Sequence, residues 1–190
     1  MPLFDAYIVV DWSAANTPTT GRDSIWYVVY RRHGHRLRRQ ALNNPPTRAA
    51  AIESLGHVLA RLVEAGQRSL VGFDFPLGYP DGTSSRLGFP GLPWRYMWQF
   101  LADEIVDDAK NCSNRFDVAE NLNRLLDDGP FPFWGNVREE ERQYLRRRGR
   151  RPHSFKDLAE WRLCDTRGRT NSSVWQLAGA GSVGSQTLTG

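Results

Sequence analysis

The chain has 190 residues, of which 40% are hydrophobic and 12% aromatic, and its formal net charge is +4. This length and composition predict a single globular domain with a substantial core and exclude a disordered chain. No segment approaches the roughly 20 consecutive apolar residues of a membrane-spanning helix, so we expect a cytoplasmic protein with no membrane partner.

Strands and one helix alternate in the first third of the chain. Short runs rich in β-branched and aromatic residues predict four strands, separated by turn residues. An Asn-Pro-Pro-Thr stretch at 44–47 begins a helix with one apolar stripe, and Gly66 ends that helix before the fourth strand. The predicted strands cover residues 6–12, 24–30, 36–42 and 69–75.

This order of elements predicts an α/β fold of the ribonuclease H-like type with a mixed sheet. In this fold two hairpins form the first three strands, and one helix then connects the third strand to the fourth. The first and fourth strands are neighbours in that plan. Asp11 ends the first strand and Asp74 ends the fourth, so the topology predicts that the two carboxylates lie side by side. Taken alone, each aspartate has a second interpretation as a residue that caps a turn.

Two carboxylates at adjacent strand ends predict a site for Mg²⁺ or Mn²⁺. Such cations prefer carboxylate oxygens, and they catalyse the cleavage or transfer of phosphoryl groups. Asp11 and Asp74 are therefore the candidate metal ligands and catalytic residues. Ser13 has two interpretations: it binds a phosphate or a metal-bound water, or it caps the turn. Glu160 is a candidate third ligand if its segment faces the site.

The sequence changes character after Asp74. Prolines and glycines over 76–93 predict a long loop, because these residues cannot continue a central strand. Apolar periodicity then predicts helices, which we interpret as an insertion over about 76–170 within one domain spanning residues 1–190. The predicted helical segments cover residues 94–128, 137–148 and 155–164.

Arginine is concentrated in two segments, and lysine occurs only twice in the chain. The first segment, 31–39, also contains two histidines, and the second, 142–151, includes Arg146, Arg147 and Arg148. Guanidinium groups bind phosphate bidentately and stack on bases, so both segments fit a nucleic-acid partner. The alternative interpretation is a solvated surface in an arginine-rich proteome.

Three short motifs stand at Val9–Ser13, at Gly72–Gly78, and at Arg162–Arg167 followed by Ser172–Trp175. They resemble the domain-of-unknown-function 429 family, a group of predicted nucleases of the ribonuclease H-like superfamily. In the third motif, Arg162, Asp165 and Arg167 form a charged cluster. The resemblance implies that its arginines neutralise a scissile phosphate, and a surface ion-pair network is the alternative.

Proteins of this family and superfamily normally continue into a fifth strand and a final helix that supplies further acidic ligands. The chain ends at Gly190, so the resemblance implies that a C-terminal strand and helix are missing. A Gly-x-Gly-x-x-Gly match at 179–184 lies near this end. It is interpreted either as a dinucleotide-binding turn or as a loop whose amides meet phosphate.

The leading functional hypothesis is a metal-dependent phosphodiester hydrolase, a nuclease. The second hypothesis is a nucleotide-binding phosphotransferase of the actin or sugar-kinase architecture, because that core also carries an aspartate on its first strand. That architecture favours a glycine after the aspartate, and Trp12–Ala15 supplies none. The third hypothesis is a non-catalytic module that binds nucleic acid or protein.

Overall fold

The computed structural model describes residues 3–137, 142–148, 158–168 and 172–190. These residues form a mixed α/β structure with one four-stranded sheet and five α-helices. Within these described ranges, no helix combines the length and the apolar character needed to cross a membrane.

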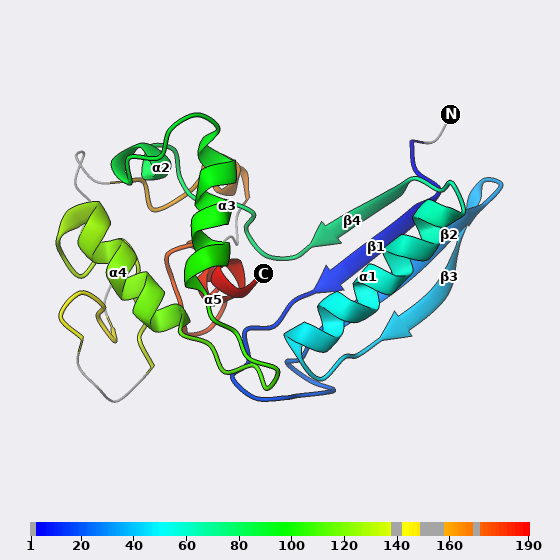
Figure 1. The fold of residues 1–190 in the computed structure, drawn as a ribbon, viewed down its shortest axis with the longest axis horizontal. Coiled ribbons are helices and arrows are strands. Elements are labelled where there is room, and N and C mark those ends of the chain that lie inside the picture. Colours follow the sequence, from blue (N-terminus) through cyan, green and yellow to red (C-terminus); the bar gives the residue numbers. More distant parts are fainter. Residues whose placement is uncertain (1–2, 138–141, 149–157, 169–171) are drawn as a thin grey trace. The chain divides into compact units, whose positions relative to one another are not determined.

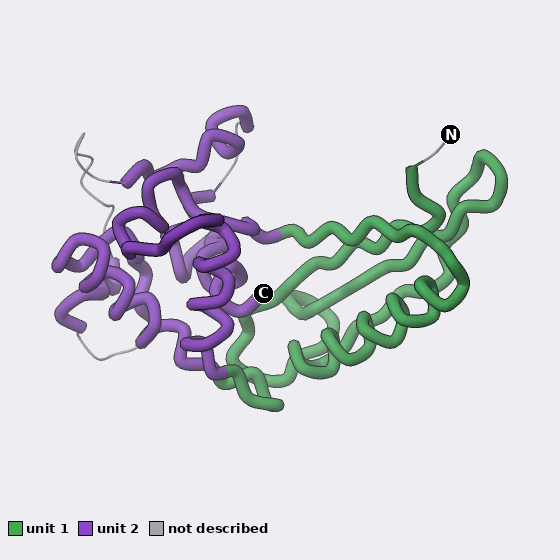
Figure 2. The backbone as a smooth tube through the Cα atoms, turned by 45° about the horizontal axis from the view of Figure 1, so that its top comes forward, with its two compact units in different colours: residues 1–74, 107–112 green, residues 75–106, 113–190 purple. Residues whose placement is uncertain are grey.

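The chain divides into two compact units, which Figure 2 distinguishes by colour. Unit 1 contains residues 1–74 and 107–112, and unit 2 contains residues 75–106 and 113–190. The interpretation of 1–190 as one domain with an insertion over about 76–170 stays a prediction, as does the missing C-terminal strand and helix.

The sheet of unit 1 has the strand order β3-β2-β1-β4 (Figure 1). β1 pairs antiparallel with β2 and parallel with β4, which makes the sheet mixed. The mixed sheet and its predicted strands are therefore confirmed, whereas the specific ribonuclease H-like fold stays a prediction. The strands are β1 (Ala6–Asp11), β2 (Trp26–His33), β3 (Arg36–Asn43) and β4 (Ser69–Phe73).

Helix α1 (Arg48–Glu64) begins and ends at the predicted signals. The Thr47 side chain accepts a hydrogen bond of 3.2 Å from the Ala50 amide, which caps the first turn. At the other end, Gly66 has φ +65° and donates its amide to the Val63 carbonyl at 2.9 Å. This left-handed conformation favours glycine, so Gly66 turns the chain toward β4.

Successive side chains of a strand point to opposite faces of the sheet. One face lies against α1 (Figure 1), and its residues Ile8, Val10 and Tyr27 are at most 2% exposed. The Tyr27 hydroxyl also forms a hydrogen bond with the Ser54 hydroxyl of α1. On the opposite face, Val9 is 55% exposed. Unit 1 therefore has a helix-covered sheet face and an exposed sheet face.

Unit 2 consists of short helices joined by long irregular segments. Its core is aromatic: the ring centroid of Trp175 lies 4.9 Å from that of Phe133 and 5.0 Å from that of Tyr79. Phe133 and Trp175 are completely buried. The elements are α2 (Thr83–Arg86), α3 (Pro93–Glu104), α4 (Arg115–Asp127), the 3-10 helix η1 (Asp165–Arg167) and α5 (Gly184–Thr189).

The helical pattern predicted over 94–128 corresponds to α3 and α4, which are separated by an irregular segment. Part of that segment, residues 107–112, belongs to unit 1. The loop predicted over 76–93 also contains the one-turn helix α2. The short helix was not predicted, because prolines and glycines surround it and both residue types favour loops.

The helix predicted over 137–148 is wrong for residues 142–148, and residues 138–141 lie outside the described residues. A turn at residues 143–144 connects Arg142 and Leu145, which form a backbone bridge. Leu145 is completely buried. Tertiary packing of this one apolar side chain therefore overrides the helical propensity of a charged segment.

The helix predicted over 155–164 is wrong for residues 158–164, and residues 155–157 lie outside the described residues. The Ser173 hydroxyl donates a hydrogen bond of 3.0 Å to the Glu160 carbonyl. Such side-chain bonds give backbone carbonyls partners outside a helix, so they stabilise an irregular conformation.

Candidate metal site

The carboxylates of Asp11 and Asp74 lie side by side at one edge of the sheet. Asp11 is the last residue of β1, and Asp74 directly follows β4. Because β1 and β4 are parallel neighbours, their carboxyl ends meet at the same edge. The Asp74 amide donates a hydrogen bond of 3.2 Å to the Val10 carbonyl, so the pairing extends to Asp74. The predicted juxtaposition is confirmed, and the role of the two residues as metal ligands stays a prediction.

The neighbouring carboxylate changes the acidity of Asp11. Partial burial, the negative charge of Asp74 and a hydrogen bond between the two side chains raise the pKa of Asp11 above its ordinary value. Two negative charges in so small a volume repel each other. The arrangement therefore favours a proton or a cation between the two carboxylates.

Asp74 is held by the backbone that follows β1. The Trp12 amide donates a hydrogen bond of 2.9 Å to Asp74 Oδ1. The Trp12 side chain is 2% exposed, and its ring centroid lies 6.0 Å from that of Phe73 in an edge-on arrangement. Trp12 is thus anchored in the core and the half-buried Phe73 packs against it, while the two aspartates themselves are exposed.

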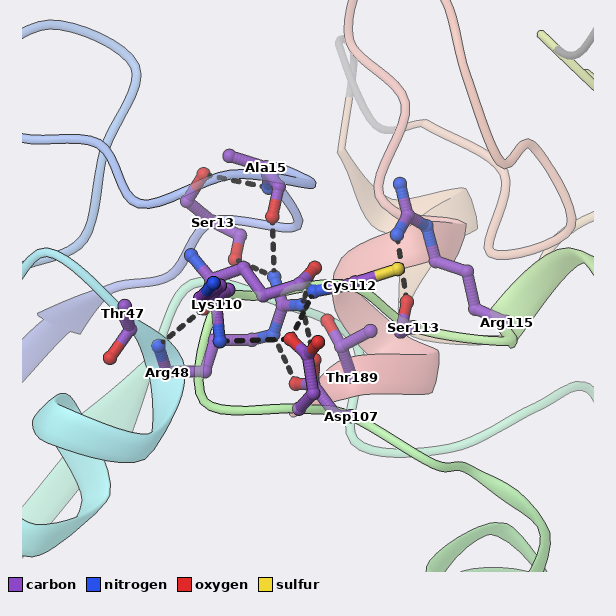
Figure 3. Close-up of polar contacts among 12 residues, drawn as sticks. Ser13, Ala15, Thr47, Arg48, Asp107, Lys110, Cys112, Ser113, Arg115 and Thr189 are labelled. Carbon is purple, nitrogen blue, oxygen red and sulfur yellow. Dashed lines mark hydrogen bonds and ion pairs between the residues drawn. The ribbon is translucent and has the colours of Figure 1, made fainter.

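Arg48 fixes the loop that follows the site, and no sequence-based prediction includes it. Its side chain is 3% exposed. Nη1 donates to the carbonyls of Ser13 (3.2 Å) and Ala15 (2.9 Å), as Figure 3 shows. Nε and Nη2 bind the two carboxylate oxygens of Asp107, and Nη2 also donates to the Asn111 carbonyl at 2.8 Å. All five N–H donors of this buried guanidinium are thereby bonded.

The sequence carries only a weak signal for this role of Arg48. The residue directly follows the cap Thr47, and most arginines at the start of a helix are solvated. Its partner Asp107 lies 59 positions further along the chain, so no local pattern connects the two. Only the folded chain reveals the pair.

Ser13 takes part in the turn after β1. Its hydroxyl donates to the Asp23 carbonyl at 3.1 Å and accepts from the Ala15 amide at 3.2 Å. These two bonds favour the turn-capping interpretation over phosphate binding.

The charged cluster of the third motif lies in unit 2. Arg162 binds both carboxylate oxygens of Asp165, at 2.8 Å from Nε and 2.7 Å from Nη2. Burial raises the pKa of Asp165, but the hydrogen bonds and charge of Arg162 outweigh this effect and lower the pKa overall. Arg167 is exposed. Arg162 therefore belongs to an internal ion pair, whereas Arg167 is accessible to a ligand.

The three central arginines of the second arginine segment are exposed in unit 2. The Arg146 guanidinium lies 5.3 Å from the centroid of the Phe131 ring, over which it is positioned. Arg147 and Arg148 are exposed as well. All three remain candidates for contact with a phosphate backbone.

Beyond the carboxylate pair, the described residues contain no cluster of three or more His, Cys, Asp or Glu side chains that could hold a metal. Glu160, the candidate third ligand, is 6% exposed in unit 2. Two carboxylates leave most positions around a hard divalent cation to water or substrate oxygens.

No protein-family model, curated protein or solved structure matches this chain. The resemblance to the domain-of-unknown-function 429 family therefore stays a prediction.

Proposed function

We propose that this protein is a metal-dependent phosphodiester hydrolase that acts on nucleic acid, with Mg²⁺ or Mn²⁺ as its cofactor and unit 1 as a ribonuclease H-like core. The observation that carries the proposal is the pair of carboxylates, Asp11 and Asp74, at the ends of two parallel strands. The cytoplasmic location expected from the sequence belongs to the same proposal.

Both carboxylates fit a hard divalent cation. Mg²⁺ is commonly bound through one or two carboxylates and keeps water or phosphate oxygens as its other ligands. Partial burial and the negative charge of Asp74 both raise the pKa of Asp11, and a cation between the two carboxylates relieves the repulsion between them. When bound, such an ion supplies an activated water and stabilises the leaving oxygen of a phosphodiester.

Other residues of unit 1 hold the pair in place. The Trp12 amide orients the Asp74 carboxylate, and the buried Trp12 ring fixes that amide. Arg48 binds the carbonyls of Ser13 and Ala15, so the chain that leaves the site has a fixed path. Preorganised ligands of this kind bind a cation without a further ordering cost.

The distribution of arginine supports nucleic acid as the substrate. The β2–β3 hairpin contains five arginines and no acidic residue. Arg146, Arg147 and Arg148 add three exposed guanidinium groups in unit 2. Arginine clusters bind a phosphate backbone by neutralising its charge and releasing counterions.

Thermal unfolding in the presence of Mn²⁺ tests the metal site. If the dissociation constant is about 1 mM, 10 mM Mn²⁺ stabilises the folded protein by about 1.4 kcal/mol. Asp11→Asn and Asp74→Asn each abolish this gain, whereas Asp81→Asn, a change of an exposed aspartate in unit 2, preserves it. Equal stabilisation of the wild type and Asp11→Asn would place the ion elsewhere and refute the proposed site.

A cleavage assay tests the hydrolase. Labelled single-stranded and duplex DNA and RNA are incubated with the protein and either Mg²⁺ or Mn²⁺. We expect cleavage that requires the ion and that Asp11→Asn abolishes. Metal binding without cleavage of any nucleic acid would instead favour the phosphotransferase or the non-catalytic module.

A further inference from the structure

The exposed face of the sheet carries aromatic residues on its two central strands. Tyr7 on β1 lies opposite Tyr30 on β2, and Asp11 lies opposite Trp26. All three aromatic side chains are partly exposed. Because side chains alternate along a strand, these residues point away from the face that α1 covers. The aromatic residues therefore share one face with the acidic pair.

This face is open between its aromatic residues. Val9 is 55% exposed and Leu70 is 46% exposed. A Cβ atom added to Gly72, the β4 partner of Val9, would meet no atom of a described residue within 4 Å. Gly72 thus leaves open space beside Val9, in the row of residues next to that of Asp11 and Asp74.

Positive charge lies along the same face. Arg39 on β3 is exposed and lies opposite Tyr30. The Arg32 guanidinium lies 5.7 Å from the Tyr7 ring centroid and donates to the Tyr7 hydroxyl at 2.8 Å. The β2–β3 hairpin contains no acidic residue that would neutralise these charges. The face thus combines aromatic rings with guanidinium groups.

We propose that this exposed face binds single-stranded nucleic acid and guides it to the carboxylates of Asp11 and Asp74. This proposal rests on the proposed function, in which nucleic acid is the substrate. It adds that the nucleic acid is single-stranded and that the exposed sheet face binds it. Bases stack on Trp26 and Tyr30, and Arg39 binds the backbone. Sheet faces with aromatic residues on central strands bind single strands in this way, since every base has a π-face.

The spacing of the rows favours a single strand over a duplex. Rows of side chains on one sheet face repeat every two residues, which is about 6.8 Å. The phosphates of one strand in duplex DNA repeat about every 3.4 Å along the axis. Trp26 and Tyr30 are four residues apart on β2, or about 13.6 Å, so each ring stacks on a separate base. Such a base must have a face that no neighbouring base covers, which a duplex does not permit.

Fluorescence anisotropy with the full chain tests the inference in EDTA, so that no cleavage occurs. The probes are fluorescein-labelled ten-nucleotide oligothymidylate and oligouridylate, and a ten-base-pair duplex. We expect the single strands to bind more tightly than the duplex. Trp26→Leu and Tyr30→Leu each weaken single-strand binding by about 5-fold or more, because they keep apolar bulk but remove the stacking ring.

Arg39→Ala and Arg38→Ala form a matched pair on the same strand. The two residues are adjacent on β3 and point to opposite faces, and both are exposed. We expect Arg39→Ala to weaken single-strand binding more than Arg38→Ala does. Because exposed arginines can be replaced without unfolding the protein, this pair tests the inference even if Trp26→Leu fails to fold.

Three results of the binding and sedimentation measurements would overturn the inference. They are tighter binding of the duplex, equal effects of Arg39→Ala and Arg38→Ala, and dimerisation that Val9→Arg disrupts while no oligonucleotide binds. The last result, measured by sedimentation, would assign the face to a second copy of the chain.

Cleavage that depends on Asp11 but not on Trp26 or Tyr30 would refute this inference and leave the proposed function intact. Single-strand binding that depends on Trp26 and Tyr30, without any cleavage, would support this inference and refute the proposed hydrolase.

Discussion

Backbone hydrogen bonds organise unit 1, whereas buried polar side chains organise much of unit 2. The four strands of unit 1 form a continuous ladder. In unit 2, Asn123 is completely buried, and its Nδ2 donates to the carbonyls of Phe133 (2.9 Å) and Tyr144 (2.6 Å). Its Oδ1 accepts from the Phe133 amide at 2.7 Å. One side-chain amide thus joins α4 to two irregular segments.

This difference shows where periodicity predicts structure and where it does not. Strands of a ladder are rich in β-branched and aromatic residues, and runs of these residues are visible in the sequence. A side chain that binds distant backbone groups leaves no periodic pattern. For this reason unit 1 agrees with its predicted elements, and unit 2 differs over 142–148 and 158–164. Arg48 is the exception in unit 1, because its buried side chain joins two irregular segments, 13–15 and 107–111, as Asn123 does in unit 2.

Arg48→Met tests this exception and has the largest expected effect. The change removes five hydrogen bonds and leaves the Asp107 carboxylate without its cation, so we expect a loss of about 3 kcal/mol in the free energy of unfolding. Urea unfolding followed by circular dichroism measures it. Arg61→Met, at an exposed position of the same helix, is expected to cost less than about 0.5 kcal/mol. Equal effects would show that the buried guanidinium adds nothing to unit 1.

Asn123→Asp tests the role of side-chain amides in unit 2. The variant keeps the acceptor for the Phe133 amide but loses both donors, so two backbone carbonyls lose their partner. We expect a loss of about 2 kcal/mol in the free energy of unfolding. The control is Asn121→Asp, because the acceptor oxygen of Asn121 that binds Arg124 is preserved. If both variants unfold at the same urea concentration as the wild type, the comparison between the units fails.

Asp11→Asn has the smallest expected effect and concerns the ladder of unit 1 at its acidic edge. The pKa of Asp11 is raised in the folded protein from an ordinary value of 3.8, so the folded state holds the proton more tightly than the unfolded state. Stability therefore falls as the pH rises from about this ordinary value through the raised pKa. We expect Asp11→Asn to increase the free energy of unfolding at pH 7, in EDTA, by at most about 1 kcal/mol.

The pH dependence distinguishes this effect from a general change in stability. Below pH 3, where Asp11 is protonated in both states, we expect the wild type and Asp11→Asn to have similar stability. Chemical denaturation at a series of pH values measures the difference. A wild type that is more stable than Asp11→Asn at pH 7 would show that Asp11 does not repel Asp74.

The sequence by itself determined the order of elements in unit 1 and the meeting of Asp11 and Asp74. Runs of β-branched and aromatic residues identified the strands, and the residues around α1 identified its ends. The neighbouring places of β1 and β4 followed from a topology with few alternatives. These features depend on local patterns and on rules of connection, which a single sequence contains.

Only the tertiary structure decided which side chains are buried and which bind distant backbone. Ile52 and Val63 are apolar residues of α1, yet they are 55% and 71% exposed. Ala51 is completely buried instead. The same holds for Arg48, whose side-chain partners come from two distant segments, 13–15 and 107–111. Burial and pairing depend on the surface that a residue meets after folding, and a one-dimensional pattern does not specify that surface.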